Sequence, residues 1–282
     1  MTSRPELANS PSAGRDTPHG GGPGRRVLIT GGASGLGLAL AKAFRGRGDR
    51  VLVVDLAESK PAAVPEDVDY FRVDVRSQQD WDAVLAHVRE LWGGLDVLVN
   101  NAGVATGGRI DVESISDWER VLDINLLGVV RGCQTFTPML KEQRSGHIVN
   151  TASLAGLVHG PGMSSYNSAK AAVVALSETL GFELAPWDIH VSAICPAFFR
   201  TNLHESLQGK DTEMEATAVR LITRADMTAD EVAAIVLKGI DRHKRIILTD
   251  RLGRQAYWTK RLARPVYDRI ALKGAQRLQR KA

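Results

Sequence analysis

Cysteine is scarce in this chain of 282 residues, which contains only Cys133 and Cys195. The two lie far apart in the sequence, each among apolar residues, so we predict buried, reduced thiols rather than a disulfide framework. The seven histidines are scattered, and no group of Cys and His has the spacing of metal ligands. The sequence therefore argues against a disulfide-rich secreted domain, predicts no metal site and favours a cytoplasmic location.

Long apolar runs are also absent. No window approaches the roughly 18 uninterrupted apolar residues of a transmembrane helix. Residues 1–24 are rich in Pro, Gly and Ser and lack the apolar segment of a secretory signal, so we predict a disordered leader. The hydrophobic content of 44% is ordinary for a globular protein with a full core.

The charge is unevenly distributed. The net charge is +4, yet residues 242–282 hold 13 Lys and Arg and 2 Asp, a balance of +11. The rest of the chain must then carry −7. The basic character belongs to the C-terminal tail, and the sequence contains no nucleic-acid-binding module, so we predict no nucleic-acid partner.

Apolar runs alternate with amphipathic segments along the chain. Short buried strands are predicted at 27–30, 51–54, 70–73, 95–99, 147–150, 191–194 and 245–249. Helices are predicted at 36–47, 79–92, 116–139 with Ser116 as N-cap, 165–184 and 228–240. This alternation predicts one α/β domain over residues 25–250, a single doubly wound parallel sheet of Rossmann type with helices on both faces.

The strand ends of such a sheet meet at one edge, where ligands bind. The residues that end the predicted strands are Thr30, Asp55, Asp74, Asn100, Ser153 and Pro196. Between the first strand and the first helix lies Thr30-Gly31-Gly32-Ala33-Ser34-Gly35-Leu36-Gly37. Glycines allow a pyrophosphate to approach the backbone, and the following helix offers free N–H groups, so this loop predicts a dinucleotide site.

Asp55 ends the second strand. At this position a carboxylate can bind both ribose hydroxyls of an adenosine and would repel the 2′-phosphate of NADP, so NAD is the predicted cofactor. The alternative is a capping Asp in a loop.

Tyr166 and Lys170 lie four residues apart, which places them on one face of a helix, and Ser153 precedes them. A neighbouring ammonium lowers the pKa of a phenol, and a tyrosine tuned in this way can exchange a proton with a substrate oxygen. A surface coincidence is the alternative explanation of the pair alone.

Taken together, these motifs resemble those of the classical short-chain dehydrogenase/reductase family. Thr30 to Gly37 has the family's TGxxxGxG form, Asn100-Asn101-Ala102-Gly103 its NNAG motif, and Asn125, Ser153, Tyr166 and Lys170 its catalytic set. Asp74-Val75 matches the pair that contacts adenine, and Pro196 to Thr201 stands where the family has PGxxxT. Ala197 replaces the usual glycine, and Phe199 replaces a smaller aliphatic residue.

The resemblance implies hydride transfer between a nicotinamide and a carbinol or carbonyl carbon, with Tyr166 as general acid or base. Lys170 would lower the pKa of Tyr166 and bind the ribose, Ser153 would donate to the substrate oxygen, and Asn125 would hold a relay water. The implied cofactor-binding residues are Gly31, Ala33, Ser34, Gly35, Leu36, Gly37, Asp55, Asp74, Val75, Asn101, Ala102, Gly103, Tyr166, Lys170, Pro196, Phe199 and Thr201. A homotetramer or homodimer is implied as well.

Three classes of function are open at this point. The first is an NAD-dependent alcohol dehydrogenase or ketone reductase, acting on CH–OH groups. The second uses the same site for double-bond reduction or epimerisation. The third is a nonenzymatic dinucleotide sensor, which the presence of both Tyr166 and Lys170 disfavours.

Two segments bear on substrate and location. Residues 202–227 correspond to the family's mobile lid, and an apolar wall is predicted from Leu154, Leu157, Val158, Met163, Phe198, Leu203, Leu207, Met214 and Val219, which implies an apolar substrate. Residues 251–282 interleave apolar and basic residues, and Pro265 divides them into two predicted amphipathic helices. Such helices can pack on the domain, bind another subunit or lie on an anionic membrane surface.

Overall fold

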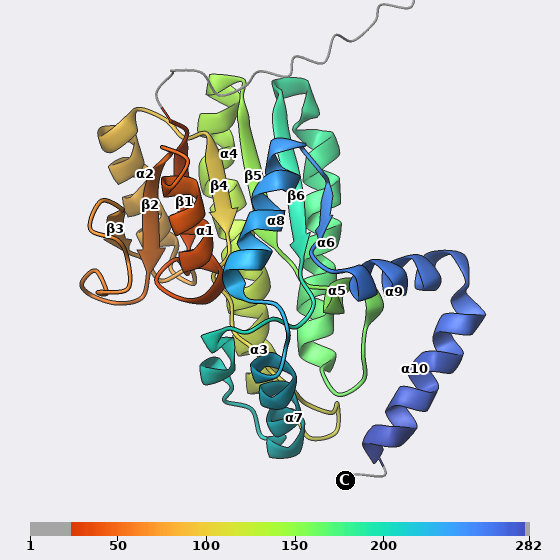
Figure 1. The fold of residues 1–282 in the computed structure, drawn as a ribbon. Helices are drawn as coiled ribbons and strands as arrows, with labels where there is room; N and C mark the ends of the chain where they lie inside the picture. Colours follow the sequence, from red (N-terminus) through yellow and green to blue (C-terminus); the bar gives the residue numbers. More distant parts are fainter. Residues whose placement is uncertain (1–23, 280–282) are drawn as a thin grey trace, which may run out of the picture.

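The computed structural model describes residues 24–279, so the predicted leader lies outside it except for Gly24. The chain forms one seven-stranded sheet in which all strands are parallel, in the order β3-β2-β1-β4-β5-β6-β7 (Figure 1). The strands are β1 (Arg26–Thr30), β2 (Arg50–Asp55), β3 (Asp69–Arg72), β4 (Val97–Asn100), β5 (Gly146–Thr151), β6 (Ile189–Cys195) and β7 (Ile246–Leu248). The predicted doubly wound parallel sheet is confirmed.

Helices cover both faces of the sheet, as Figure 1 shows. The α-helices are α1 (Gly35–Arg45), α2 (Gln78–Trp92), α3 (Ile115–Leu122), α4 (Gly128–Gln143), α5 (Ala155–Val158), α6 (Ser164–Glu183), α7 (Thr212–Thr223), α8 (Ala229–Asp241), α9 (Arg251–Leu262) and α10 (Arg264–Gln279). Helices α1 and α8 pack on one face, and α2, α4 and α6 pack on the other. Within residues 24–279, no helix is long and apolar enough to cross a membrane.

The strands carry apolar residues on both faces because both faces are covered. Leu40, Phe44 and Val236 lie fully buried in the layer between β1, β2 and helices α1 and α8. On the opposite face Trp81 and Phe136 meet edge to face, with 6.3 Å between their ring centroids. Cys133 and Cys195 are buried and unpaired, as predicted.

The long helix predicted at 116–139 is interrupted and begins earlier. Ser114, not Ser116, is its N-cap, because Ser114 and Asp117 form a reciprocal capping box. A π-helical segment, Asp123–Leu127, separates α3 from α4 and contains Asn125. The first helix is also shorter than predicted and ends at Arg45.

The lid segment carries helical structure that the sequence did not predict. A short 3-10 helix, η3 (Asn202–Ser206), leads to α7, and both lie beyond the carboxyl ends of the strands (Figure 1). Arg109 ties the lid to the domain, since its Nε donates to Asp211 Oδ2 over 2.8 Å. Ala105 N donates to Ser206 Oγ over 2.8 Å and forms a second link.

The tail forms two helices, and Pro265 lies in the first turn of the second. Asp250 caps α9, which packs against α5, while α10 continues away from the domain (Figure 1). One of the three alternatives for the tail, packing on the domain, therefore holds for α9. The side chain of Leu278, a predicted apolar position, lies outside the described residues.

His147 is buried near the amino end of β5, at the edge of the sheet opposite to the carboxyl ends of the strands. Its Nε2 lies 2.8 Å from Ser192 Oγ, and that hydroxyl donates to Lys244 O over 2.6 Å, so Nε2 carries the proton and donates. His190 and His243 lie next to it, with ring centroids 5.8 and 5.5 Å away. Burial, reinforced by both neighbouring histidines, lowers the pKa of His147 to about 3.

This lowered pKa predicts loss of stability in mild acid. As pH falls below 6.5, the ordinary value, the unfolded chain takes up a proton at His147 and the folded chain does not, so the free energy of unfolding decreases. Between pH 7 and 5 the loss from this residue is about 2 kcal/mol, since each unit of pKa difference corresponds to ~1.4 kcal/mol. Urea unfolding at both pH values should show a smaller loss for His147→Gln than for the unaltered chain. His87→Gln is the control, and equal pH dependence in all three proteins would contradict the prediction.

Candidate functional site

A cavity of about 610 Å³ lies at the carboxyl ends of the strands, where the strand order reverses between β1 and β4. Of the residues predicted to act here, those that line it are Gly31, Ser34, Gly35, Leu36, Asp55, Asp74, Val75, Asn101, Ala102, Gly103, Ser153, Tyr166, Lys170, Pro196, Phe199 and Thr201. Ala33, Gly37 and Asn125 do not line the cavity. They lie behind it and contact the lining residues Asp55, Gly31 and Val104, respectively.

The glycine loop leaves the start of α1 open toward the cavity. Gly31 and Gly35 adopt left-handed backbone conformations, with φ of 61° and 51°, which glycine favours. A Cβ atom at Gly37 would lie 2.1 Å from the Gly31 carbonyl oxygen, so the first turn of α1 packs directly on the loop.

Among residues 24–279, no side chain accepts a hydrogen bond from the first N–H groups of α1. Ser34 makes no capping hydrogen bond, and the first turn has no acidic residue, whereas Ser77 caps α2 and Thr228 caps α8. Free N–H groups at a helix start bind anionic phosphates, so this end of the cavity fits the pyrophosphate of a dinucleotide.

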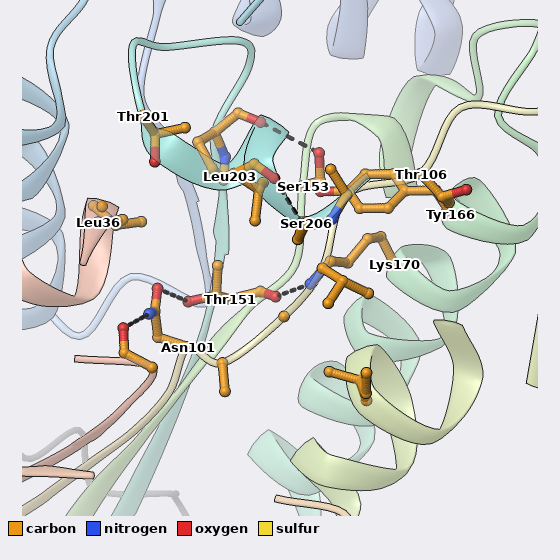
Figure 2. Close-up of a pocket in the computed structure, with 18 of the residues that line it drawn as sticks. Leu36, Asn101, Thr106, Thr151, Ser153, Tyr166, Lys170, Thr201, Leu203 and Ser206 are labelled. Carbon is orange, nitrogen blue, oxygen red and sulfur yellow. Dashed lines mark hydrogen bonds between the residues drawn. The ribbon is translucent and has the colours of Figure 1, made fainter. Parts of the chain in front are cut away.

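Thr30 and Asn101 join the ends of β1 and β4. The Thr30 hydroxyl accepts hydrogen bonds from Asn101 N and Ala102 N, both over 2.9 Å. The Asn101 amide donates to Thr30 O and Gly31 O over 3.0 and 3.2 Å. The Asn101 side chain therefore holds the glycine loop, and its amide also contacts Thr151 (Figure 2).

Asp55 lies at the cavity wall with both carboxylate oxygens bonded to backbone. Oδ2 accepts from Ala33 N over 3.0 Å, and Oδ1 accepts from Leu56 N over 2.8 Å. Asp55 thus braces the glycine loop as well as presenting a negative charge to the cavity. This contact explains why Ala33 lies behind the loop rather than in the cavity wall.

Asp74 is paired with a cation that the sequence analysis did not single out. Arg76 Nη2 lies 2.7 Å from Asp74 Oδ2, and this hydrogen-bonded pair lowers the pKa of Asp74 despite partial burial. Arg76 also lines the cavity. The positive charge of Arg76 therefore lies beside the cavity, but the paired carboxylate of Asp74 offsets it.

Tyr166, Lys170 and Ser153 face the same part of the cavity (Figure 2). Helix α6 carries the first two, and Ser153 follows β5. Burial raises the pKa of Tyr166, and the nearby Ser153 side chain only partly offsets this. The net direction in this structure is opposite to the lowering by Lys170 that the sequence analysis expected.

Lys170 is 3% exposed and donates from Nζ to Thr151 O over 2.8 Å (Figure 2). Its Nζ lies 5.8 Å from the centroid of the Tyr166 ring. Burial lowers the pKa of Lys170 to about 8, so its side chain is mainly protonated at neutral pH. A cation is thus available near the phenol, although its hydrogen bond goes to Thr151.

Asn125 is fully buried and fastens the segment after the NNAG sequence. Its Oδ1 accepts from Val104 N over 2.9 Å, and its Nδ2 donates to Val104 O over 3.0 Å. A Cβ atom at Gly103 would lie 2.8 Å from Asn125 Oδ1 and 3.6 Å from Lys170 Nζ, so the two side chains converge on this glycine. The relay water expected at Asn125 stays a prediction.

The substrate side of the cavity differs in part from the apolar wall expected from the sequence. Leu154, Val158, Met163, Phe198 and Leu203 line the cavity as predicted. Leu157, Leu207, Met214 and Val219 are absent from this lining, and α7 presents Ala218 and Ile222 instead. Met214 packs under Gly162, where a Cβ atom would lie 2.6 Å from its sulfur.

The two departures from the family motif are accommodated without strain. Ala197 is not among the residues with positive φ, so its side chain costs no backbone strain. Phe199 is 9% exposed and packs into the core layer of α1 and α8 while still touching the cavity. Pro196 O accepts from Leu154 N over 2.8 Å and joins this loop to the segment of Ser153.

Thr151 and Arg120 are among the cavity residues that the sequence analysis missed. Thr151 lies two residues before Ser153 at the end of β5, and strand periodicity alone could have placed both on one side. Arg120 lies one helical turn before Ile124, and its Nη2 is buried without a hydrogen-bond partner in the described part of the chain. Within residues 24–279, no group of three or more His, Cys, Asp or Glu is arranged to hold a metal ion.

Comparison with known proteins connects this geometry to an activity. Residues 25–212 match the family model described as short chain dehydrogenase. The chain is 33% identical over 224 residues to 2-(R)-hydroxypropyl-CoM dehydrogenase of Xanthobacter autotrophicus, which covers 76% of this chain and 90% of that protein.

Solved structures agree on the fold. A short-chain dehydrogenase/reductase of Burkholderia phymatum in complex with NAD superposes with a TM-score of 0.78 at 30% identity, covering 85% of this chain and 95% of that one. A short-chain dehydrogenase of Sphingobium yanoikuyae in complex with NADPH gives 0.71 at 27% identity, covering 89% and 95%. Similar chains thus bind either dinucleotide.

Proposed function

The chain belongs to the short-chain dehydrogenase family, and from this premise we propose that it is an NAD(H)-dependent oxidoreductase that interconverts a secondary alcohol and a ketone of an apolar substrate. Membership of the family makes it a dehydrogenase or reductase that acts on CH–OH groups and binds a nicotinamide dinucleotide. The choice of NAD, the apolar substrate and the role of each residue are proposals.

The observation that carries the proposal is the convergence of Ser153, Tyr166 and Lys170 on one wall of a cavity whose other end is an open helix start. The open N–H groups of α1 fit a pyrophosphate. A dinucleotide whose pyrophosphate bound at the start of α1 would have the rest of the same cavity, with Ser153, Tyr166 and Lys170, for its nicotinamide. The same cavity is continuous with the apolar residues of the lid, which leaves room for a substrate beside Tyr166.

The side chains have distinct roles in this proposal. A nicotinamide, when bound, would supply or accept the hydride. Tyr166 takes the hydroxyl proton in oxidation and returns it to the carbonyl oxygen in reduction. Ser153 donates to the same oxygen and stabilises charge that develops there. Lys170 provides the cation that favours the phenolate and opposes the effect of burial on the pKa of Tyr166.

Tyr166→Phe tests the acid/base role. We expect kcat to fall by roughly a hundredfold or more, as is typical when general acid–base catalysis is lost, while dinucleotide binding measured by fluorescence is retained. Tyr257→Phe, which removes the hydroxyl of a half-buried tyrosine on α9 that is bonded to Arg261, is the matched control and should leave kcat unchanged. Retention of kcat in Tyr166→Phe would refute the assigned role.

NAD is favoured over NADP because Asp55 places a negative charge at the adenosine end. A 2′-phosphate would lie near this carboxylate, while the nearby cation of Arg76 is already paired with Asp74. Relatives bind either cofactor, so the preference rests on this charge arrangement.

Asp55→Asn removes the negative charge while its single amide oxygen can still accept from Ala33 N, which keeps the contact with the glycine loop and gives up the bond from Leu56 N. We expect the ratio of kcat/KM for NAD to that for NADP to fall roughly tenfold, since each ~1.4 kcal/mol of differential interaction changes it by that factor. Asp69→Asn, at an exposed residue of β3, is the control. A preference for NADP in the unaltered chain would contradict the proposal.

The substrate is proposed to be apolar because Leu154, Val158, Met163, Phe198 and Leu203 line the cavity beside Tyr166. A panel of secondary alcohols and ketones assayed by nicotinamide absorbance should give the highest kcat/KM for lipid-like, terpenoid, steroid or aromatic compounds. Small polar sugars as the best substrates would overturn this assignment.

Cytoplasmic location, assembly into a homodimer or homotetramer and peripheral contact with an anionic membrane stay predictions. The outward face of the tail supports membrane contact. It exposes Leu252, Trp258, Leu262, Val266, Ile270 and Leu272 among basic residues, and Arg251 and Arg254 flank Trp258 in a shallow groove. Apolar and basic side chains on one helix surface favour binding to anionic bilayers.

Flotation with phosphatidylserine vesicles measures this contact, and equal flotation without residues 251–282 would exclude a role for the tail.

A further inference from the structure

The turn that follows Ser153 forms part of the substrate wall. Helix α5 is a single turn, and Leu154, Ala155 and Val158 in and beside it line the cavity. The turn ends at His159, whose backbone is left-handed with φ of 56° although it is not a glycine. A one-turn helix of this kind has little internal stability, so its position depends on contacts from outside.

The last carbonyl groups of a helix have no partner within the helix. In α5 the tail supplies two of these partners. Lys260 Nζ donates to Leu157 O over 2.6 Å, and the Tyr267 hydroxyl donates to Val158 O. Gly156 O accepts from His159 Nε2 and Ala155 O accepts from His159 N, both over 3.1 Å.

Lys260 also holds His159. Because His159 Nε2 donates to Gly156 O, its Nδ1 carries the lone pair, and Lys260 Nζ donates to that atom over 2.6 Å. The ammonium group thus lies at the C-terminal end of α5, where a positive charge is favourable. The first turn of α9 also packs closely against Leu154, since a Cβ atom at Gly253 would lie 3.1 Å from Leu154 Cδ2.

We propose that α9 and α10 act as a C-terminal clamp that sets the substrate wall of the active site, with Lys260 and Tyr267 as positioning residues. The clamp is defined by the contacts of Lys260 and Tyr267 with residues 157–159. It acts on Leu154 and Val158 through the backbone of α5 and touches no part of the dinucleotide end. This deepens the proposed function and rests on it for the effect on substrate.

The match to the family model spans residues 25–212, so Lys260 and Tyr267 lie outside it. Figure 1 shows α9 beside α5 at the edge of the domain, with α10 extending beyond it. The substrate preference of this chain should therefore depend on residues far in sequence from the catalytic set.

The test uses the full chain with Lys260→Met, Tyr267→Phe and the double variant. Each change removes the donor and keeps most of the side chain. Lys273→Met on α10 and Tyr257→Phe on α9 are matched controls that remove the same groups from exposed or unrelated positions. Hydrogen–deuterium exchange reports on the backbone of residues 154–159, and dinucleotide affinity is measured separately by fluorescence.

We expect faster exchange at 154–159 in the double variant, with unchanged exchange in the glycine loop and unchanged dinucleotide affinity. For the best apolar substrate KM should rise roughly threefold to tenfold, with a smaller change in kcat, as expected when the three hydrogen bonds that hold this binding surface are lost. The ranking of substrates by size should shift, because a looser wall admits bulkier groups. The controls should match the unaltered chain in every measurement.

The outcomes separate the clamp from the proposed function. Unchanged exchange at 154–159 in the double variant would overturn the clamp, whatever the activity. Faster exchange with KM and substrate ranking unaltered would overturn its effect on the substrate wall. Faster exchange in a chain that oxidises no alcohol and reduces no ketone would count against the proposed function while supporting the clamp on α5.

Discussion

The joint between the ends of β1 and β4 is the constraint on which the rest of the site depends. The Thr30 hydroxyl accepts hydrogen bonds from Asn101 N and Ala102 N. The Asn101 side-chain amide donates two hydrogen bonds to the carbonyl oxygens of Thr30 and Gly31. These four bonds close the point where the strand order reverses. Because the glycine loop is held from this side and by Asp55 from the other, α1 begins at a defined place with its N–H groups free for a phosphate.

Asn125 extends this constraint to the catalytic wall. By bonding both polar groups of Val104, it fixes the chain directly after Gly103, around which Lys170 also packs. Its place in a π-helical segment interrupts the helix that carries it, and such interruptions are frequent at functional sites. The site is thus built by polar side chains that bond to backbone. Asp55, Asn101 and Lys170 also line the cavity, whereas Thr30 and Asn125 support it from behind.

The sequence predicted the sheet, its face-covering helices and most of the cavity lining because these follow from local patterns. Apolar runs, glycine spacing and a Tyr/Lys pair at i and i+4 are all readable within short windows. One error was a missed local motif, since Ser114 is the N-cap because Asp117, three residues later, completes a capping box. The other errors arose where tertiary contacts determine the structure. Met214 lies outside the expected apolar wall because Gly107 and Gly162 leave room for it. Pairing of Arg76 with Asp74, burial of Arg120 Nη2 and the contact of Lys170 with Thr151 depend on side-chain packing, which the sequence pattern does not encode.

The clamp has a consequence for the order in which the site is completed during synthesis. Chains leave the ribosome from the N-terminus at roughly 5–20 residues per second. The glycine loop, Asp55 and Asn101 therefore emerge on the order of ten seconds before Lys260 and Tyr267, given that rate. A nascent chain can thus assemble the dinucleotide end of its cavity while the substrate wall is still without the side chains that hold it.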